Sequence, residues 1–423
     1  HKKMNEPNLP VSKTPFLTGY TNLMKSILGV GVITYPLLFY RIGILPTIIL
    51  MTISAMFSFL GLAIYLKLNY KKNKTITDLT NIKFINYFIT FIIFTKCVAV
   101  SISYIITIRD IIYSLNIIDE FQNFEKGTLL KISSSNIENV SKIKKIIFIL
   151  ITFSIAPLSS LKSFSKLQFT SFLGLISVLM MLVISCLRFA PINPSRIRST
   201  DKLMKLNENL LTSFYLRTEF VQQDFLETDD YFFLLLQSLG SFVYSFTCHQ
   251  NVFSFSNECQ MPLKRTFFCV ITVIISCIII YTIFGLLNAY IIGLNVFSLI
   301  KSKNDDLIIQ GNNLNDSLSK GTANFFVSLP ADRFTLFLKL FFLLVIIFAI
   351  PLQLNTVQKQ INLSNIFKRL ILSYLIHSVG LIVSFLNLNF NSIIKNIGGT
   401  VSSFLCFIIP GCLLFILRYF STD

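Results

Sequence analysis

The sequence predicts an all-α membrane protein with ten transmembrane helices, and three observations carry this prediction. Of its 423 residues, 53% are hydrophobic and only 13% are charged, and the mean hydropathy is +0.69. Apolar runs long enough to cross a bilayer recur along the chain. Two of these runs are interrupted by glycines or polar residues. So low a charged fraction argues against a soluble enzyme.

Each expected helix corresponds to one apolar run, because a bilayer core about 30 Å thick needs roughly 20 apolar residues. The runs lie at 16–40, 43–66, 84–115, 144–161, 165–189, 231–256, 267–292, 334–354, 369–386 and 393–417. The fourth run is short. The first exceeds the apolar core of a signal peptide and continues directly into the second, so we expect it to remain in the protein.

The orientation follows from basic residues near the ends of the runs, which place the N-terminus on the inner side. This predicts a cytosolic segment at 1–15, helices one to five at 16–189, a long outer loop at 190–230, and helices six to ten at 231–418 with an outer loop at 293–333. The net charge of +17 is not concentrated in one soluble region, so no nucleic-acid binding is expected.

Two helices are expected to be broken. Gly29 and Gly31 precede Pro36 in the first run, and a polar cluster spans 240–251 in the sixth. Helices one and six hold matching positions in two five-helix halves, and an odd number of helices inverts the second half. Broken helices at matching positions favour a midplane substrate site, where half-helix ends hold charged groups. For the first break alone, a packing kink is the alternative.

Four motifs resemble the amino acid/auxin permease family, which includes sodium-coupled neutral and vacuolar amino acid transporters. They are Asn22 to Gly31 with Pro36, Ala156 to Lys162, Phe246 to Phe253 with Glu258, and Gly399 to Gly411 with Pro410. The resemblance implies a five-plus-five inverted repeat, the LeuT-like fold of the APC superfamily, and an amino acid as substrate. The family normally has eleven helices, and an eleventh is not expected within these residues.

The expected substrate site combines both breaks with an aromatic residue of the third helix that matches the family. Its candidates are Ile27, Leu28, Gly29, Val30, Gly31, Tyr104, Ser245, Phe246, Thr247 and Cys248. Small and apolar residues here favour a neutral, bulky or aromatic amino acid, since a basic one would want a carboxylate. Tyr104 has simple packing as its alternative. An aromatic-lined cavity also suggests incidental transport of hydrophobic cationic drugs.

Lys25 stands where sodium-coupled members of the family usually carry an asparagine that ligates the ion. The eighth helix of such members supplies a hydroxyl near its proline, whereas residues 345–350 before Pro351 offer none. Hard cations prefer oxygen ligands, so we expect sodium-independent transport. Lys25 then acts as a fixed cation or couples substrate to protons. The alternative is that Lys25 extends to the inner interface.

Other polar residues within the runs have weaker assignments. Lys96 and His249 are candidates for coupling or gating, each with a structural hydrogen bond as its alternative. Arg109 and Asp110 are expected to pair or reach the interface, and Lys339 to extend outward. His377 is expected to make an interhelical hydrogen bond. Three His and scattered Cys predict no metal site, and no other cofactor is expected.

These features predict a monomeric amino acid transporter, proton-linked or uniporting, in the membrane of an acidic compartment such as a vacuole or lysosome; the plasma membrane is the alternative. An amino acid sensor that signals through a partner is the rival function. A polytopic enzyme is disfavoured because no catalytic arrangement appears at a membrane face. A channel is disfavoured because no selectivity motif is visible.

Overall fold

The structure is a computed structural model in which all regular structure among the described residues is helical. It describes residues 16–29, 31–69, 76, 82–115, 134–160, 168–189, 228–259, 261–300, 325–330, 332–361, 363–386 and 390–419. Val30 and the segments 1–15 and 190–227 lie outside this set, and so does most of 293–333.

The first half of the chain forms helices that follow the first five apolar runs. They are α1 (Phe16–Ile27), α2 (Gly31–Ile42), α3 (Ile44–Asn69), α4 (Lys83–Ser114), α6 (Ser134–Leu158) and α7 (Gln168–Phe189). The second half forms α10 (Thr228–Ser245), the 3-10 turn η3 (His249–Asn251), α11 (Val252–Cys259), α12 (Leu263–Ile300), α14 (Phe325–Ser328), α15 (Arg333–Ile347), α16 (Ile350–Gln360), α17 (Ile366–Phe385), α18 (Phe390–Ile397), the π-helical segments Gly398–Ser402 and Phe404–Ile408, and α19 (Ile409–Tyr419).

Eight helices among the described residues are long and apolar enough to cross a membrane. A ninth span is formed if α1 and α2, bent by 45° at their break, count as one. The predicted fourth span, 144–161, overlaps α6, which ends at Leu158 and is not among them, so ten spans are not confirmed. Lys142, Lys144 and Lys145 shorten the apolar part of α6, which explains the difference.

One predicted loop, 293–333, is partly helical. The outer loop expected from residue 293 begins later, because α12 continues to Ile300. Within the same expected loop, α14 buries Phe325 and Phe326. The ring of Phe326 lies 5.3 Å from Phe342 of α15, and that of Phe325 lies 5.9 Å from Phe284 of α12. This short helix therefore packs into the bundle.

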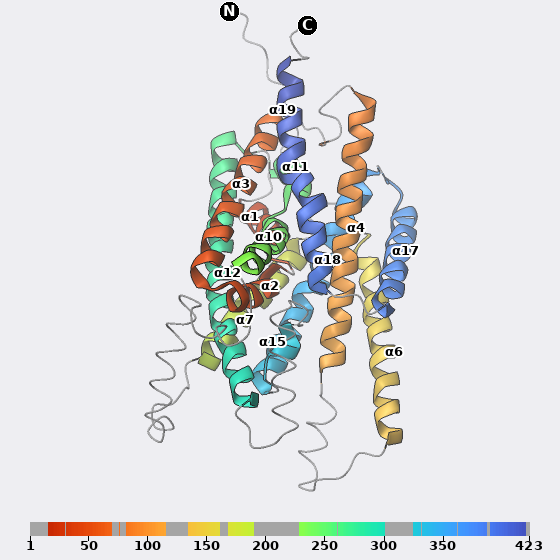
Figure 1. Ribbon diagram of the computed structural model, residues 1–423. Helices are drawn as coiled ribbons and strands as arrows, with labels where there is room; N and C mark the ends of the chain where they lie inside the picture. Colours follow the sequence, from red (N-terminus) through yellow and green to blue (C-terminus); the bar gives the residue numbers. More distant parts are fainter. Residues whose placement is uncertain are drawn as a thin grey trace, which may run out of the picture.

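The helices form a bundle around the two broken segments (Figure 1). In this view α1, α2 and α10 lie centrally, with α3 and α12 on one side and α4, α6 and α17 on the other. Large apolar side chains such as Phe84, Phe367 and Ile382 are exposed on the outside, whereas Lys25 and Lys96 are buried. Exposed apolar side chains around buried cations suit a protein surrounded by lipid.

Both helices are broken where the sequence predicts. The first break lies between Ile27 and Gly31, and Pro36 is accommodated inside α2. The second break comprises residues 246–248, between α10 and η3. A third interruption separates α15 from α16 at residues 348–349, just before Pro351, which has no backbone N–H to donate. These breaks expose backbone groups in the interior of the bundle.

Candidate functional site

A small cavity lies where the two broken helices meet α4 and α16. Its lining residues are Ser26, Ile27, Gly29, Gly31, Lys96, Val100, Tyr104, Tyr244, Thr247 and Gln353. The cavity volume of about 10 Å³ suffices for one water molecule. An amino acid therefore fits only after surrounding side chains move, and we call this contracted form of the site the closed state.

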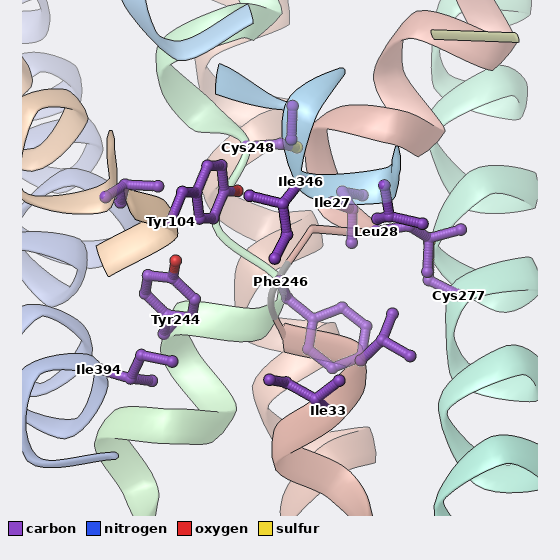
Figure 2. Close-up of a cluster of buried hydrophobic side chains, with 14 of the residues drawn as sticks. Ile27, Leu28, Ile33, Tyr104, Tyr244, Phe246, Cys248, Cys277, Ile346 and Ile394 are labelled. Carbon is purple, nitrogen blue, oxygen red and sulfur yellow. The ribbon is translucent and has the colours of Figure 1, made fainter. Parts of the chain in front are cut away.

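Some predicted site residues line the cavity and others pack behind it. Ile27, Gly29, Gly31, Tyr104 and Thr247 line it. The remaining described candidates, Leu28, Ser245, Phe246 and Cys248, are buried but are not among its lining residues. Figure 2 shows Tyr104 and Tyr244 at the left of the view, with Phe246 and Leu28 to their right. Val30 lies outside the described residues.

Four lining residues were not predicted, and the sequence held a signal for three of them. Tyr244 belongs to the polar cluster of the sixth run, Ser26 follows Lys25, and Gln353 stands two residues after Pro351. Val100 offers no such signal, because it is one apolar residue in a long apolar run.

The two glycines of the first break permit close packing. A Cβ added to Gly29 would collide with the Tyr104 hydroxyl, and one added to Gly31 would lie 3.0 Å from the Ser245 Oγ. The Gly29 amide donates to the Ile27 carbonyl at 2.8 Å, so the chain turns sharply at this point. Small residues therefore bring the broken first helix against α4 and α10.

The carbonyls at the second break are held by side chains from neighbouring helices. Ser58 of α3 donates its hydroxyl to the Phe246 carbonyl at 2.8 Å. Lys96 of α4 donates to the Thr247 carbonyl at 3.0 Å. Unpaired backbone groups are costly within a membrane, so these two contacts help to keep the helix open at 246–248.

Tyr281 of α12 connects the two breaks, and the sequence gave no reason to single it out. Its buried hydroxyl lies 2.9 Å from the carbonyl of Ile27, the last residue of α1, and 3.0 Å from that of Ser245, the last residue of α10. One hydroxyl hydrogen thus serves two helix C-termini. Its ring stacks on Tyr35 at 4.4 Å, which fixes its orientation.

Lys96 both lines the cavity and makes a structural hydrogen bond. Besides Thr247, its Nζ donates to Gln250 Oε1 at 2.5 Å, and Gln250 Nε2 donates to Gln353 Oε1 at 3.2 Å. The side chain is only 2% exposed. Lys96 therefore ties α4 to the second break, and the Gln250–Gln353 pair extends this contact to α16.

A second polar network joins the same elements at a neighbouring position. Asn251 of η3 donates its Nδ2 to the Ser26 Oγ of α1 at 2.6 Å, and it accepts a hydrogen bond from the Thr356 hydroxyl of α16. All three side chains are buried. The two broken helices are thereby linked to α16 through satisfied hydrogen bonds, as a buried polar network requires.

His249 has a hydrogen-bond partner at each ring nitrogen. Its Nε2 lies 3.1 Å from the Ser58 carbonyl, and its Nδ1 lies 3.2 Å from the Cys406 Sγ. The carbonyl can only accept, so Nε2 carries a hydrogen, and the Cys406 thiol can donate to Nδ1. These contacts are compatible with a neutral imidazole, and His249 does not line the cavity. A coupling role stays a prediction.

Lys25 is buried inside the helix bundle. It is 1% exposed, and its Nζ donates to the Val345 carbonyl of α15 at 2.7 Å. Gly174 of α7 leaves the room for its ammonium, since a Cβ there would lie 2.7 Å from Nζ. Lys25 stands in the last turn of α1 and Val345 in the last turn of α15. The ammonium thus lies at the negative end of the α15 dipole.

The other basic side chains follow the same pattern. Arg109 pairs with Asp110 at 2.6 Å, as predicted, and also donates to the Ser384 carbonyl near the end of α17. Lys339 reaches the C-terminal end of α4, where it donates to the Ser114 carbonyl at 2.8 Å while remaining buried. His377 is an exception: its Nδ1 lies 2.7 Å from the Ser373 carbonyl of its own helix α17, whereas an interhelical hydrogen bond was expected.

Helix C-termini therefore receive several of the buried cations. Their terminal carbonyls lack partners within the helix and carry partial negative charge, so a nearby ammonium or guanidinium is favoured. Among the described residues, no group of three or more His, Cys, Asp and Glu side chains is placed to hold a metal ion. The polar chemistry of this interior is that of carbonyls, hydroxyls, amides and fixed cations.

Comparison with known proteins adds a family and several relatives. A family model described as "Transmembrane amino acid transporter protein" matches residues 12–292, which include both breaks, Lys25, Lys96 and Tyr281. The chain is 24% identical over 246 residues to vacuolar amino acid transporter 6 of Saccharomyces cerevisiae, covering 57% of this chain and 47% of the relative. It is 23% identical over 258 residues to vacuolar amino acid transporter 5 of the same yeast, covering 57% and 48%.

A third relative aligns over nearly all of the chain. Vacuolar amino acid transporter 5 of Schizosaccharomyces pombe is 24% identical over 426 aligned positions, covering 96% of this chain and 85% of the relative. The chain spans only about half the length of the two Saccharomyces relatives.

Proposed function

Since the chain belongs to the transmembrane amino acid transporter protein family, we propose that it is a secondary active transporter that moves an amino acid by alternating access. The observation that carries the proposal is the cavity at the meeting point of two broken helices, α1/α2 and α10/η3. Broken helices facing one site are typical of such transporters. The closed cavity then corresponds to a state between opening to either side.

We also propose that the two halves of the chain form an inverted structural repeat. Each half of the chain begins with a broken helix, the first half with α1/α2 and the second half with α10/η3. Five apolar runs were predicted in each half, so the two halves match run for run. This supports a five-plus-five inverted repeat of the LeuT-like kind, in which one group of helices rocks against the other around the site. Tyr281 and the Ser26–Asn251–Thr356 network hold the two broken helices together in the closed state.

The ends of the broken helices suit both charged groups of an amino acid. The first turn of α2 presents the positive end of a helix dipole toward a carboxylate, and the C-terminal end of α1 suits an ammonium, whereas the end of α10 already holds the Lys96 ammonium. Ile27, Val100, Tyr104 and Tyr244 supply an apolar and aromatic wall. We propose neutral amino acids, including aromatic ones, as substrates, with Tyr104 as the side chain that moves to admit them.

Lys25 takes the place of a sodium ion in this proposal. Its ammonium binds a carbonyl of α15 and lies between α1, α7 and α15, so it occupies a position that a cation ligated by α1 and the eighth helix would need. A sodium ion at this position and the Lys25 ammonium would repel each other, because both are cations. Transport is therefore sodium-independent, either proton-linked or uniporting.

The relatives guide the proposed location. All three are named vacuolar amino acid transporters. A sodium-independent transporter can use the proton gradient of an acidic compartment, so we place this protein in a vacuolar or lysosome-like membrane.

The test is uptake of a radiolabelled amino acid mixture into proteoliposomes, compared with protein-free vesicles. Ile382→Ala, on the 65% exposed lipid-facing position of α17, serves as a control that keeps uptake. Saturable uptake by both proteins supports the function. Saturable binding without flux would contradict it and favour the sensor instead.

A further inference from the structure

We propose that Lys96 sets the charge selectivity of the substrate site, so that amino acids with cationic side chains are excluded and those with neutral or anionic side chains are accepted. This inference rests on the proposed transport function and names a residue that determines its specificity. It follows from the composition of the cavity wall and from the hydrogen bonds of the Lys96 ammonium.

Lys96 alone carries a formal charge among the described residues that line the cavity. The other lining residues are apolar, hydroxyl-bearing or amide-bearing, and none is Asp or Glu. The side chain is 2% exposed, so bulk water does not screen its charge. A buried charge requires compensation by hydrogen bonds or by an opposite charge.

The partners of Lys96 satisfy only part of this requirement. An ammonium has three hydrogens to donate, and the two contacts of Lys96 are to uncharged oxygens, the Thr247 carbonyl and Gln250 Oε1. The C-terminal end of α10 contributes a partial negative charge of about half a unit. The wall of the cavity therefore remains net positive, and we infer that the charge of Lys96 acts on a group that enters the cavity.

A positive wall ranks substrates by the charge of their side chains. At about 6 Å and an effective dielectric constant of about 20, repulsion between two unit charges weakens binding roughly 100-fold. The α-amino and α-carboxyl groups are common to all amino acids, so a comparison of side chains of similar size isolates this effect. Hydrophobic cationic drugs meet the same repulsion and are excluded as well.

A purely structural role for Lys96 makes a different prediction. If the ammonium only caps α10 at Thr247, its removal lowers uptake of every amino acid by the same factor. If it pairs with the α-carboxylate, its removal also weakens all amino acids equally. Only a charge facing the side-chain end of the site changes the ratio between a cationic and a neutral amino acid.

The experiment measures inhibition of leucine uptake in proteoliposomes by lysine, glutamine and glutamate, which are similar in size. For the wild type we expect lysine to inhibit at least 10-fold more weakly than glutamine, with glutamate at least as strong as glutamine. For Lys96→Met we expect lysine and glutamine to differ by less than about 3-fold. Lys96→Arg, which keeps the charge, should retain the wild-type ranking.

Several results would overturn the inference. Equal inhibition by lysine and glutamine in the wild type refutes it without any variant, which matters if Lys96→Met does not fold. An unchanged lysine-to-glutamine ratio in an active Lys96→Met protein refutes the role of Lys96 while leaving transport intact. A wild type that takes up no amino acid at all refutes the proposed function, and with it this inference.

Discussion

Replacing Tyr281 by phenylalanine removes the hydroxyl that joins the two broken helices and leaves the ring in place. In the wild type this hydroxyl lies 2.9 Å from the Ile27 carbonyl and 3.0 Å from the Ser245 carbonyl. The phenylalanine ring can still stack on Tyr35 and contact Phe246. The substitution therefore isolates the hydrogen bond from the packing.

The expected magnitude follows from the buried acceptors. Leaving one buried acceptor without its donor costs about 1–3 kcal/mol. Because a single hydrogen serves both carbonyls, we expect the total to stay within that range. Since the contact joins the two broken helices in the closed state, the closed state becomes roughly 5- to 150-fold less populated relative to the open ones.

The assay has two parts. Thermal unfolding of Tyr281→Phe in detergent should show a Tm lower by roughly 1–4 °C. Initial rates of amino acid uptake should show a maximal rate reduced about 10-fold, because the protein must pass through the closed state in each cycle. Tyr87→Phe is the matched control, since Tyr87 is 74% exposed on the outside of the bundle.

Unchanged Tm and unchanged uptake in Tyr281→Phe would refute the reasoning that this hydroxyl holds the two breaks together. An equal effect in Tyr87→Phe would show that loss of any tyrosine hydroxyl perturbs the protein, and would also remove the argument.

Two further predictions concern the lining and the wall behind it. Gly29→Ala should lower uptake at least 10-fold, because the added Cβ collides with the Tyr104 hydroxyl. Gly411→Ala is the control and should have no effect, because nothing lies within 4 Å of its added Cβ. Equal uptake by both variants would refute the packing account. His249→Gln keeps a donor for the Ser58 carbonyl, so uptake should retain the pH profile of the wild type. Loss of the pH dependence in His249→Gln would instead show that His249 couples protons.

The two helix breaks could be predicted from the sequence, because they depend on residues that are close together in the chain. Glycines and polar residues within apolar runs located both helix breaks, because such residues interrupt helices wherever they occur. The family resemblance, rather than this pattern, singled out Lys25, which the structure buries. It could not identify the acceptor, since Val345 lies 320 residues away in the chain and contributes a carbonyl that any residue type could offer.

Features set by packing between distant helices were missed. Tyr281 is one of 15 tyrosines and stands in an apolar run, so nothing in the sequence distinguishes a bridging hydroxyl from a packed ring. The fourth predicted span was counted from apolar residues alone, although nearby lysines shorten the apolar part of α6. The helical continuation of α12 to Ile300 and the burial of α14 likewise depend on contacts made only in the folded bundle.

The most direct test of the account is initial-rate amino acid uptake into proteoliposomes with sodium and proton gradients imposed separately, for the wild type and for Lys25→Asn and Lys25→Ala. We predict that the sodium gradient does not affect the uptake rate of the wild type. We also predict that both Lys25 variants lose at least 90% of the wild-type uptake rate, a tenfold change that corresponds to about 1.4 kcal/mol. Stimulation of the wild type by sodium would contradict the account. So would normal uptake with normal pH dependence in both Lys25 variants.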